Sequence, residues 1–280
     1  MVLFYFILMD SSVSININSI LNKLLLYKIP QSQLSKLARF GVDNDGGYVI
    51  LKPDSISSSQ SLIWDLYISA GIGNEESFSK NFITYYGLQK NQCWAFDGTI
   101  ASYPRQYKPC PPQGIWFVSK NIGPQMTDMT VNLGRLISQY NNIFLKMDIE
   151  GAEYDWLLSL SVKQLTNFKE IVIEFHNINT DCRVANVWKL LNSTHMAIHI
   201  HPNNFGGTIN NIPNVVEITY IRRNDCAFIT NTDNIIETEH DITDPATDKW
   251  TIYPKGTPIY PIKNIDFPNN PRTPDLYLTL

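Results

Sequence analysis

The stretch that decides the fold is Phe144 to Leu158, FLKMDIEGAEYDWLL. Residues 141–147 have the continuous apolar character of a buried strand, and the segment after the glycine carries apolar residues at helical spacing. Asp148, Glu150 and Glu153 therefore follow the carboxyl end of a strand. Because ligands bind at that edge of an open α/β sheet, we expect these three acids to border a binding site.

Other apolar runs alternate with helix-like stretches, which is typical of an α/β domain with a largely parallel sheet. The expected strands are residues 61–70, 91–96, 114–119, 141–147, 168–176, 197–201 and 214–222. The expected helices between them are residues 74–86, 129–140, 154–160 and 183–191. We divide the chain into three parts. Residues 1–38 form an N-terminal helical segment, residues 39–223 an α/β domain, and residues 224–280 a loop-rich C-terminal extension without chemistry of its own.

The composition favours one globular domain in a reducing compartment. The chain has 280 residues, of which 44% are hydrophobic, and a formal net charge of -4. Basic residues gather nowhere along it, so we expect no nucleic-acid partner. The four cysteines are far apart and show no CxxC pairing, so a cytoplasmic location is the simplest inference.

The N-terminal segment is expected to add helices to the domain. Met1 to Met9 is apolar but shorter than the ~20 residues that span a bilayer, so we expect no membrane span. It packs on the body of the protein, forms a disordered start, or makes a weak membrane contact. Ile and Leu at helical spacing predict helices at residues 15–26 and 31–40.

A second glycine-containing turn lies at Asp45, Gly46 and Gly47, before an extended stretch at 48–51. One interpretation is a hairpin turn. The other is a place where the backbone approaches a ligand, with polar contacts from Asp45 or Tyr48.

The strand at 61–70 runs into a glycine loop, GIGNEESF. Gly71 and Gly73 allow a tight turn with bare backbone beside a ligand, and Asn74 is a plausible helix cap. Glu75 and Glu76 are expected in the first helical turn, where they would repel a pyrophosphate. A nucleoside ligand without phosphates therefore fits better than NAD, and S-adenosylmethionine is such a ligand.

Asp97 follows the next strand, about 20 residues beyond the glycine loop, where an acid binds ribose hydroxyls in this class of fold. A turn residue is the plainer interpretation of an acid that follows a strand. The coupling to the glycine loop favours ribose binding, and residues 120–123 are then expected near the adenine.

The motifs GGYV, ISAGIGNEESF, CWAFDGT, FLKMDIEGAEYDWL, IVIEFH, HIHPNN and VVEITYIRR occur in an order that resembles the FkbM-type methyltransferases. This family is a branch of the class I S-adenosylmethionine-dependent enzymes, and the resemblance covers roughly residues 39–223. It implies a Rossmann-like sheet of seven strands with the last strand antiparallel. It also implies O-methylation of small or carbohydrate acceptors.

The resemblance assigns cofactor contacts to four residues. Gly71 and Gly73 would pack against the cofactor, Asp97 would hold its ribose, and Asp148 would lie near the transferred methyl. Ser69 departs from the pattern, because many class I enzymes have an acid there that contacts the methionine amine. Glu75, Asp148 or Tyr48 are candidates to replace that contact.

Two mechanisms are compatible with the acids at the strand ends. Asp148 or His176 acts as a general base for an acceptor hydroxyl, with Glu174 and His176 on one face of the strand at 168–176. Alternatively, Asp148, Glu150 and Glu174 hold Mg or Mn, which acidifies the hydroxyl. Glu150 and Glu153 also suit a helix N-terminus without any catalytic role.

Polar residues near the sixth strand are candidates for acceptor contacts, namely Glu174, His201, Asn203 and Asn204. A zinc site at His195, His199 and His201 is a weaker interpretation. Lys146 is expected to be a structural partner of a nearby acid. The leading function is O-methylation of a sugar or glycan hydroxyl.

Two other functions stay open. An RNA ribose methyltransferase commonly needs a lysine at the end of the fifth strand, where this chain has Glu174 and His176. A Rossmann module that binds NAD is disfavoured by Glu75 and Glu76. The sequence leaves the oligomeric state open.

Overall fold

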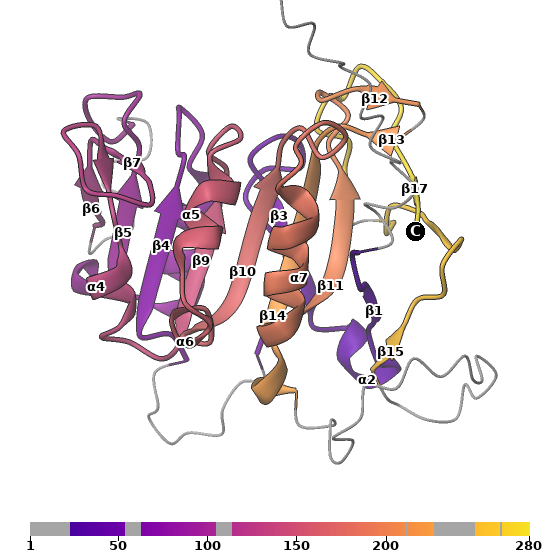
Figure 1. Ribbon diagram of the computed structural model, residues 1–280, viewed down its shortest axis with the longest axis horizontal. Helices are drawn as coiled ribbons and strands as arrows, with labels where there is room; N and C mark the ends of the chain where they lie inside the picture. The colour runs from indigo at the N-terminus through magenta and orange to yellow at the C-terminus, as the bar shows by residue number, and fades with distance from the viewer. Residues whose placement is uncertain (1–22, 54–62, 105–113, 211, 227–249, 264) are drawn as a thin grey trace, which may run out of the picture.

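The computed structural model describes residues 23–53, 63–104, 114–210, 212–226, 250–263 and 265–280. The apolar start at Met1 to Met9, most of the helix expected at 15–26 and residues 227–249 of the tail lie outside the described residues. The described chain is a mixed α/β, Rossmann-like fold built on a central, mostly parallel sheet (Figure 1).

The central sheet has seven strands. Their spatial order is β11 (His195–Pro202), β14 (Val216–Arg222), β10 (Phe168–Phe175), β9 (Ile143–Met147), β4 (Leu66–Ala70), β5 (Cys93–Phe96) and β6 (Trp116–Val118). The pairs from β10 through β6 are all parallel, whereas β14 runs antiparallel to both β10 and β11. The chain leaves β4 toward β5 and later returns to β9 on the other side of β4. This change of direction makes the edge between β4 and β9 a topological switch point, where such sheets bind ligands.

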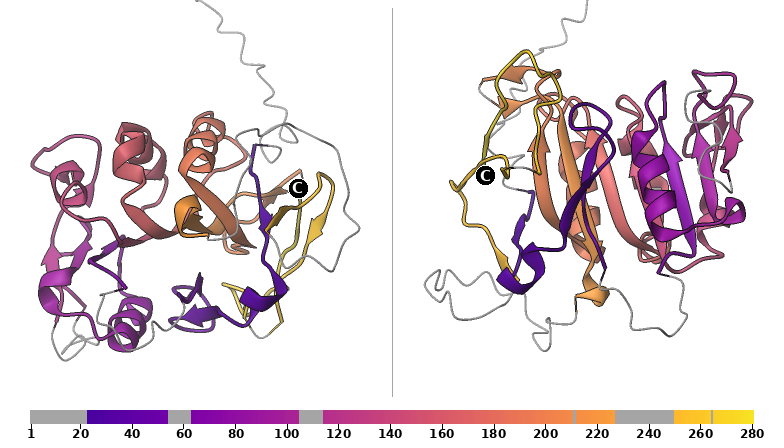
Figure 2. Two further views of the ribbon diagram at one scale, coloured as in Figure 1. Left: turned by 90° about the horizontal axis from the view of Figure 1, so that it is seen from below. Right: turned by 180° about the vertical axis from the view of Figure 1, so that it is seen from behind.

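One face of the sheet is covered by α4 (Gly134–Ile137), α5 (Glu153–Ser159), α6 (Val162–Leu165) and α7 (Val184–Thr194) (Figure 2). Trp156, Leu157, Trp188 and Leu191 point from these helices into the main core and are fully buried. Burial of large apolar side chains is the main force that holds such layers together.

The opposite face carries α3 (Ser77–Tyr86) and a hairpin of β2 (Leu37–Phe40) and β3 (Tyr48–Leu51). An aromatic cluster packs there, with the ring centroids of Phe82 and Phe144 only 4.1 Å apart. Gly87 ends α3 in the left-handed conformation that favours glycine. The ring of Tyr48 packs edge-on against Phe78 of α3, with centroids 5.7 Å apart, and this contact holds Tyr48 over the sheet.

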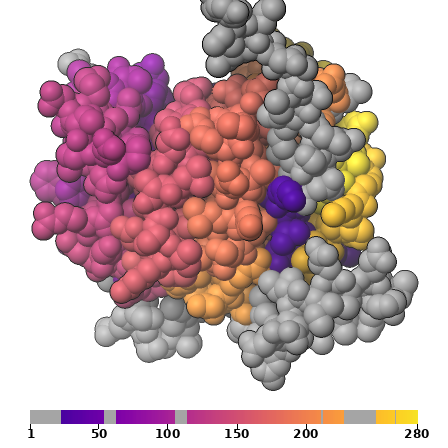
Figure 3. Space-filling view, viewed as in Figure 1, coloured from indigo at the N-terminus to yellow at the C-terminus, as the bar shows by residue number. Residues whose placement is uncertain are grey.

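The remaining elements are short. They are β1 (Tyr27–Lys28), α2 (Gln31–Leu34), η1 (Lys90–Gln92), β7 (Asn121–Ile122), β8 (Thr130–Val131), β12 (Thr208–Ile209), β13 (Ile212–Pro213), η3 (Arg223–Asp225), β15 (Thr251–Ile252), β16 (Pro258–Ile259) and β17 (Leu278–Thr279). Because β1 pairs with β15, the N-terminal strand and the C-terminal segment share one side of the molecule (Figure 3).

The seven expected strands of the sheet are present, but two N-terminal predictions are wrong in their described parts. Leu26 forms a bridge to Ala197 and leads into β1, so the end of the segment at 15–26 is extended. The segment at 31–40 contains one helical turn, after which Leu37–Phe40 pairs with β3. Leu37 and Phe40 are buried there, so tertiary packing overrides a spacing that also suits a helix.

Two further helix predictions are corrected. The segment at 129–140 begins as β8 and forms only the short helix α4. The helix expected to be capped by Asn74 begins at Ser77, and Glu76 is its cap residue. Among the described residues, no helix has the length and apolar character needed to cross a membrane.

Candidate active site

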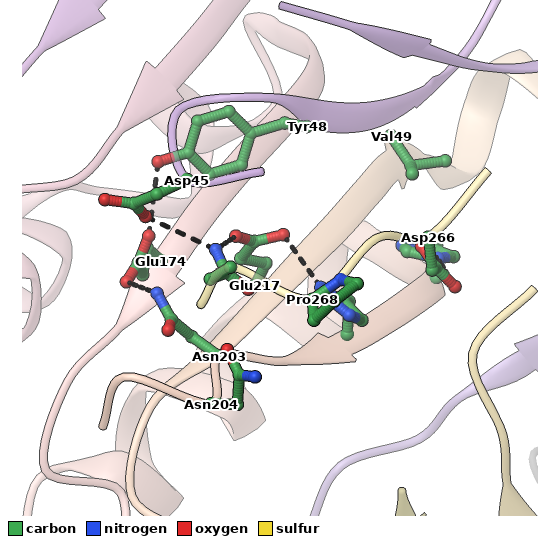
Figure 4. A network of polar contacts seen from close by, with 12 residues as sticks. Asp45, Tyr48, Val49, Glu174, Asn203, Asn204, Glu217, Asp266 and Pro268 are labelled. Atoms are coloured by element: carbon green, nitrogen blue, oxygen red, sulfur yellow. Dashed lines mark hydrogen bonds and ion pairs between the residues drawn. The ribbon is translucent and has the colours of Figure 1, made fainter. Parts of the chain in front are cut away.

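Acidic side chains gather at the edge of the sheet where β9 and β10 end and β14 begins. Figure 4 shows three of them, Asp45, Glu174 and Glu217. Asp148 follows β9, and Glu174 and His176 mark the end of β10. Since β14 is antiparallel to β10, its first residues reach the same edge, and Glu217 is directly opposite Glu174. The sheet itself therefore assembles this acidic edge.

His176 is the centre of the acidic edge. Its Nδ1 lies 2.8 Å from Glu153, a fully buried residue at the start of α5. Its Nε2 lies 3.7 Å from Asp148, 3.6 Å from Glu174 and 3.4 Å from Glu150. Although burial alone would lower the pKa of His176, its bond to Glu153 and the surrounding acids raise that pKa above the ordinary value. Glu150 is largely exposed, with its backbone in the left-handed region.

Tyr48 bridges two of these acids from the other side of the sheet. Its hydroxyl lies 3.2 Å from Asp148 Oδ2 and 3.2 Å from Glu174 Oε2. Glu174 also accepts a 2.7 Å hydrogen bond from Asn203. Burial, and after it the charge of Asp148, raises the pKa of Glu174 well above its ordinary value. Three of the sequence-predicted residues, Tyr48, Asp148 and Glu174, are thus in contact.

A second polar layer joins the C-terminal segment to the acidic edge. Asn269 donates to Glu217 over 2.7 Å and to Asp45 over 3.3 Å. Burial raises the pKa of the Asp45 carboxyl. The turn at residues 45–47 is a hairpin turn, as one interpretation predicts, and it also brings Asp45 to this edge.

Two histidines of β11, His199 and His201, hold the C-terminal segment. His201 is fully buried between Glu217 and Asp275, whose contacts raise its pKa to about 10 even though burial alone would lower it. His199 pairs with Asp266 at 2.9 Å. The described part of residues 224–280 is therefore tied to the central sheet through these contacts, and the expectation that the segment has no chemistry of its own stays a prediction.

The expected acceptor contacts of the β11 region are used within the protein. His201 is occupied as above, and Asn204 donates to carbonyl groups of Asn270 and Thr273. His195 lies 2.9 Å from the Phe168 carbonyl, and burial lowers its pKa to about 4. Asn203 reaches the edge through Glu174. Over the described chain, the one group of residues with metal-compatible geometry is Asp148, Glu174 and His176, so a zinc site of His195, His199 and His201 is not formed.

The glycine loop packs directly against the backbone of Asp148. A Cβ at Gly71 would lie 1.5 Å from the Asp148 carbonyl oxygen, so no side chain fits there. Gly73 has a φ of +46°, and a Cβ at this position would meet nothing within 4 Å, so the loop presents open backbone there. Lys146 donates a 2.6 Å hydrogen bond to the Gly71 carbonyl and lies 3.9 Å from Asp148, consistent with a structural partner.

Asp97 holds the glycine loop in place. Its Oδ2 accepts hydrogen bonds from the amides of Ile72 and Gly73, at 3.0 and 2.8 Å. Its Oδ1 accepts from the amide and the hydroxyl of Thr99. Although burial alone would raise the pKa of Asp97, these bonds hold it below the ordinary value.

The two glutamates after the loop differ from the sequence prediction. Neither lies in the first turn of α3, which contains no acid. Glu76 turns inward, where it is almost fully buried and accepts hydrogen bonds from Ser69 and Tyr103. Glu75 instead accepts a 2.7 Å bond from the Ser77 amide at the start of the helix. Ser69 therefore lies behind the loop, with its hydroxyl engaged by Glu76.

Sequence reasoning misses several residues of the acidic edge. It places Glu153 at a helix terminus or a site border, without its partner His176. Glu217 is an acid within an otherwise apolar, alternating strand, and that unusual position is a usable signal. Asn269 and Asp275 lie in a stretch with no regular pattern, so nothing in the sequence singles them out.

No protein-family model matches this chain, and no curated protein matches it in sequence. The site itself therefore carries the chemical inference. An open glycine loop packs on the backbone of Asp148, and a buried histidine with a fixed orientation lies beside the carboxylate of the same residue. Such an arrangement can bind a ligand on the loop and accept a proton at its edge.

Proposed function

We propose that this protein is an S-adenosylmethionine-dependent O-methyltransferase that acts on a hydroxyl of a sugar or glycan. The observation that carries the proposal is the direct packing of Gly71 on the Asp148 backbone. It brings an open loop that suits a cofactor next to acids that suit proton transfer. The strand order, with β14 antiparallel beside β10, supports the same proposal.

The residues that would hold the cofactor are Gly71, Gly73 and Asp97. The open backbone at Gly73 fits a ligand that lies against the loop. Asp97 would bind the ribose, and three of the four hydrogen bonds that it accepts come from backbone amides. A ribose hydroxyl would replace the fourth, from the Thr99 hydroxyl. When bound, the cofactor supplies an electrophilic methyl group on a sulfonium.

The loop is less suited to a diphosphate. The amides of Ile72 and Gly73 already donate to Asp97, and the Glu75 carboxylate occupies the start of α3. Backbone amides of this kind normally bind a pyrophosphate, but here a pyrophosphate would first have to displace the carboxylates that already accept from them. This arrangement disfavours NAD, although through different contacts from those that the sequence suggests.

The acidic edge would handle the acceptor hydroxyl. Holding the acceptor oxygen in line with the methyl group can lower the activation barrier by several kcal/mol. The proton of the hydroxyl would pass to Asp148 or to Nε2 of His176, which is the ring nitrogen that Glu153 leaves facing the other acids.

The charge of the edge favours an uncharged, hydroxyl-rich acceptor. Asp148 and Glu217 lie close enough to Glu174 and Asp45 for their negative charges to raise the pKa of those two carboxyls, beyond the larger effect of burial. Lys146 is buried beneath the loop and already bonded to it. An acceptor rich in phosphates, such as RNA, would meet like charge here. The end of β10 also has no lysine.

Two measurements test the proposal. Thermal unfolding with S-adenosylhomocysteine or NAD should show a rise in Tm only with the former, since a ligand selective for the folded state stabilises it. Labelled methyl transfer should then be measured to free glycans, nucleotide sugars and capped RNA. We expect transfer to a glycan; transfer only to RNA, or stabilisation only by NAD, would replace the proposal.

A further inference from the structure

We infer that Asp148, Glu174 and His176 form a binding site for a divalent first-row metal cation, with Mn²⁺ as the matching probe. This inference rests on the proposed function only for the cation's part in the reaction. The binding itself depends on the three side chains. It also changes the ligand set expected from the sequence, because His176 replaces the largely exposed Glu150.

The three side chains offer ligand atoms that all lie within 4.8 Å of one another. They are placed by the paired ends of two parallel strands, since Ile173 of β10 is in register with Met147 of β9. A site on paired strands is held more rigidly than a site on loops. The ligands therefore come from a preformed edge of the sheet.

Two atoms of this group have ligand-binding capacity that the protein leaves unused. Asp148 Oδ1 is buried and has no hydrogen-bond partner among the described residues. Nε2 of His176, a residue about nine-tenths buried, faces acids at 3.4 to 3.7 Å. At these separations Nε2 is within ion-pair range of the acids but makes no short hydrogen bond. The unbonded Asp148 Oδ1 and Nε2 of His176 thus face each other, 3.7 Å apart.

The distances between the ligand atoms of Asp148, Glu174 and His176 fit a cation held between them better than direct hydrogen bonds from one side chain to another. Two ligand atoms that each lie about 2.1 Å from a metal are about 3 Å apart when they occupy adjacent positions. Nε2 of His176 is 3.7 Å from Asp148 Oδ1 and 3.6 Å from Glu174 Oε1. Small side-chain rotations would close that difference.

The surrounding contacts orient the three ligands. Glu153 holds Nδ1 of His176 at 2.8 Å, which fixes the ring as carboxylates do for metal-bound histidines. Asn203 donates to Glu174, and Tyr48 lies beside both acids. The Tyr48 hydroxyl has one proton for two carboxylates at equal distance. A cation between those acids would remove the remaining repulsion.

The ligand set selects among metals. Two carboxylates with one imidazole suit Mn²⁺ better than Mg²⁺, which prefers oxygen ligands. Three protein ligands leave coordination positions open, so two neighbouring hydroxyls of a sugar could bind there. A hydroxyl bound to such a cation would lose its proton more readily, and the proton would then pass to the exposed Glu150 carboxylate or to water, because the cation would occupy Asp148 and Nε2 of His176.

The test is a Mn²⁺ titration of the full-length protein, followed by the electron paramagnetic resonance signal of free Mn²⁺. We expect one saturable site per chain, about tenfold or more weaker in Asp148→Asn and in His176→Gln. Asp155→Asn is the matched control, because it removes the same charge from an exposed side chain on α5. Its affinity should equal that of the unmodified protein. Mg²⁺ should compete poorly and Zn²⁺ well.

Absence of saturable binding, or equal loss of affinity in Asp155→Asn, would overturn the inference. Unchanged affinity in Asp148→Asn would do the same, and this variant decides the matter if His176→Gln does not fold. The Tm shift with S-adenosylhomocysteine is measured on the same samples. A shift without Mn²⁺ binding removes only the cation site, whereas Mn²⁺ binding without a shift removes only the proposed methyltransferase function.

Discussion

The carboxylate of Glu153 lies 2.8 Å from Nδ1 of His176, and both residues are buried. The contact fixes which nitrogen of the ring faces Asp148 and Glu174. Because Glu153 also accepts a hydrogen bond from the Gly151 amide, it ties the orientation of the histidine to the turn after β9. Glu153 is thus a positioning residue for His176.

Replacing Glu153 by glutamine tests this role. The glutamine oxygen can still accept from the Gly151 amide, but the carboxylate charge beside His176 is lost. We expect the rate of methyl transfer to fall about 10- to 100-fold, as when other carboxylates that orient a functional histidine are removed, with unchanged affinity for S-adenosylhomocysteine. Single-turnover assays and calorimetry measure the two quantities.

The pH profile separates positioning from a general structural effect. Glu153 raises the pKa of His176, so its removal should shift the ionisation seen in the rate profile to lower pH when the profile is measured without added divalent cation. Asp155→Asn, on the same helix, should leave the rate and profile unchanged. An unaltered profile in Glu153→Gln would mean that the contact has no part in the reaction.

Asp97 and Asp148 should fail in different ways when each is changed to asparagine. Asp97 accepts four hydrogen bonds. The side-chain amide of asparagine would place an N–H group opposite donors that need an acceptor, which would cost about 1–3 kcal/mol of stability in the loop. We expect Asp97→Asn to weaken S-adenosylhomocysteine binding at least tenfold. Asp148→Asn should mainly lower turnover. Equal loss of binding in calorimetry of both variants would show that these roles are misassigned.

Alanine at Gly71 and at Gly73 should separate folding from ligand binding. At Gly71 the new Cβ would collide with the Asp148 carbonyl, so we expect strong destabilisation in urea unfolding. At Gly73 there is open space, and the cost is the left-handed backbone alone, about 1–2 kcal/mol. Gly73→Ala should therefore fold but bind S-adenosylhomocysteine poorly. Normal binding by folded Gly73→Ala would place the ligand elsewhere.

The central sheet is predictable because its strands carry long apolar runs. β4, β9 and β10 are buried along their whole length or nearly so, and each ends at a polar residue or turn that reaches the ligand edge. The pairing of Tyr48 with Glu174 joins residues 126 positions apart. Sequence reasoning selects Tyr48 through the glycine turn that precedes it and Glu174 through its place at the end of a strand, but it does not predict this contact.

The errors have a common physical origin. Leu37 and Phe40 suit a helix as well as a strand, and only the pairing of Phe40 with Tyr48 decides between them. Asn269 reaches Asp45 across 224 positions, and no local pattern encodes such a contact. Glu76 is expected from the sequence in the first turn of the helix, facing a ligand, whereas its carboxylate points inward and accepts hydrogen bonds from Ser69 and Tyr103.

The pH dependence of stability should report the burial of His201 between two acids. Its pKa is about 10 in the folded protein, compared with about 6.5 in an unfolded chain. The folded state therefore keeps a proton that the unfolded state loses between these values. The resulting stabilisation is complete below pH 6.5 and is lost as the pH rises toward 10, by up to a few kcal/mol at about 1.4 kcal/mol per unit.

His201→Gln should lack this dependence. We expect the free energy of unfolding in urea to fall from pH 6.5 to 9 more steeply for the unmodified protein than for the variant. Other groups that titrate in this range, such as Glu170 with its pKa raised by burial to about 8, affect both proteins equally and cancel in the difference. Parallel pH curves for the two proteins would show that His201 is not held in its charged form. The C-terminal segment would then be held by its other contacts, among them those of Asn269 and Asp266.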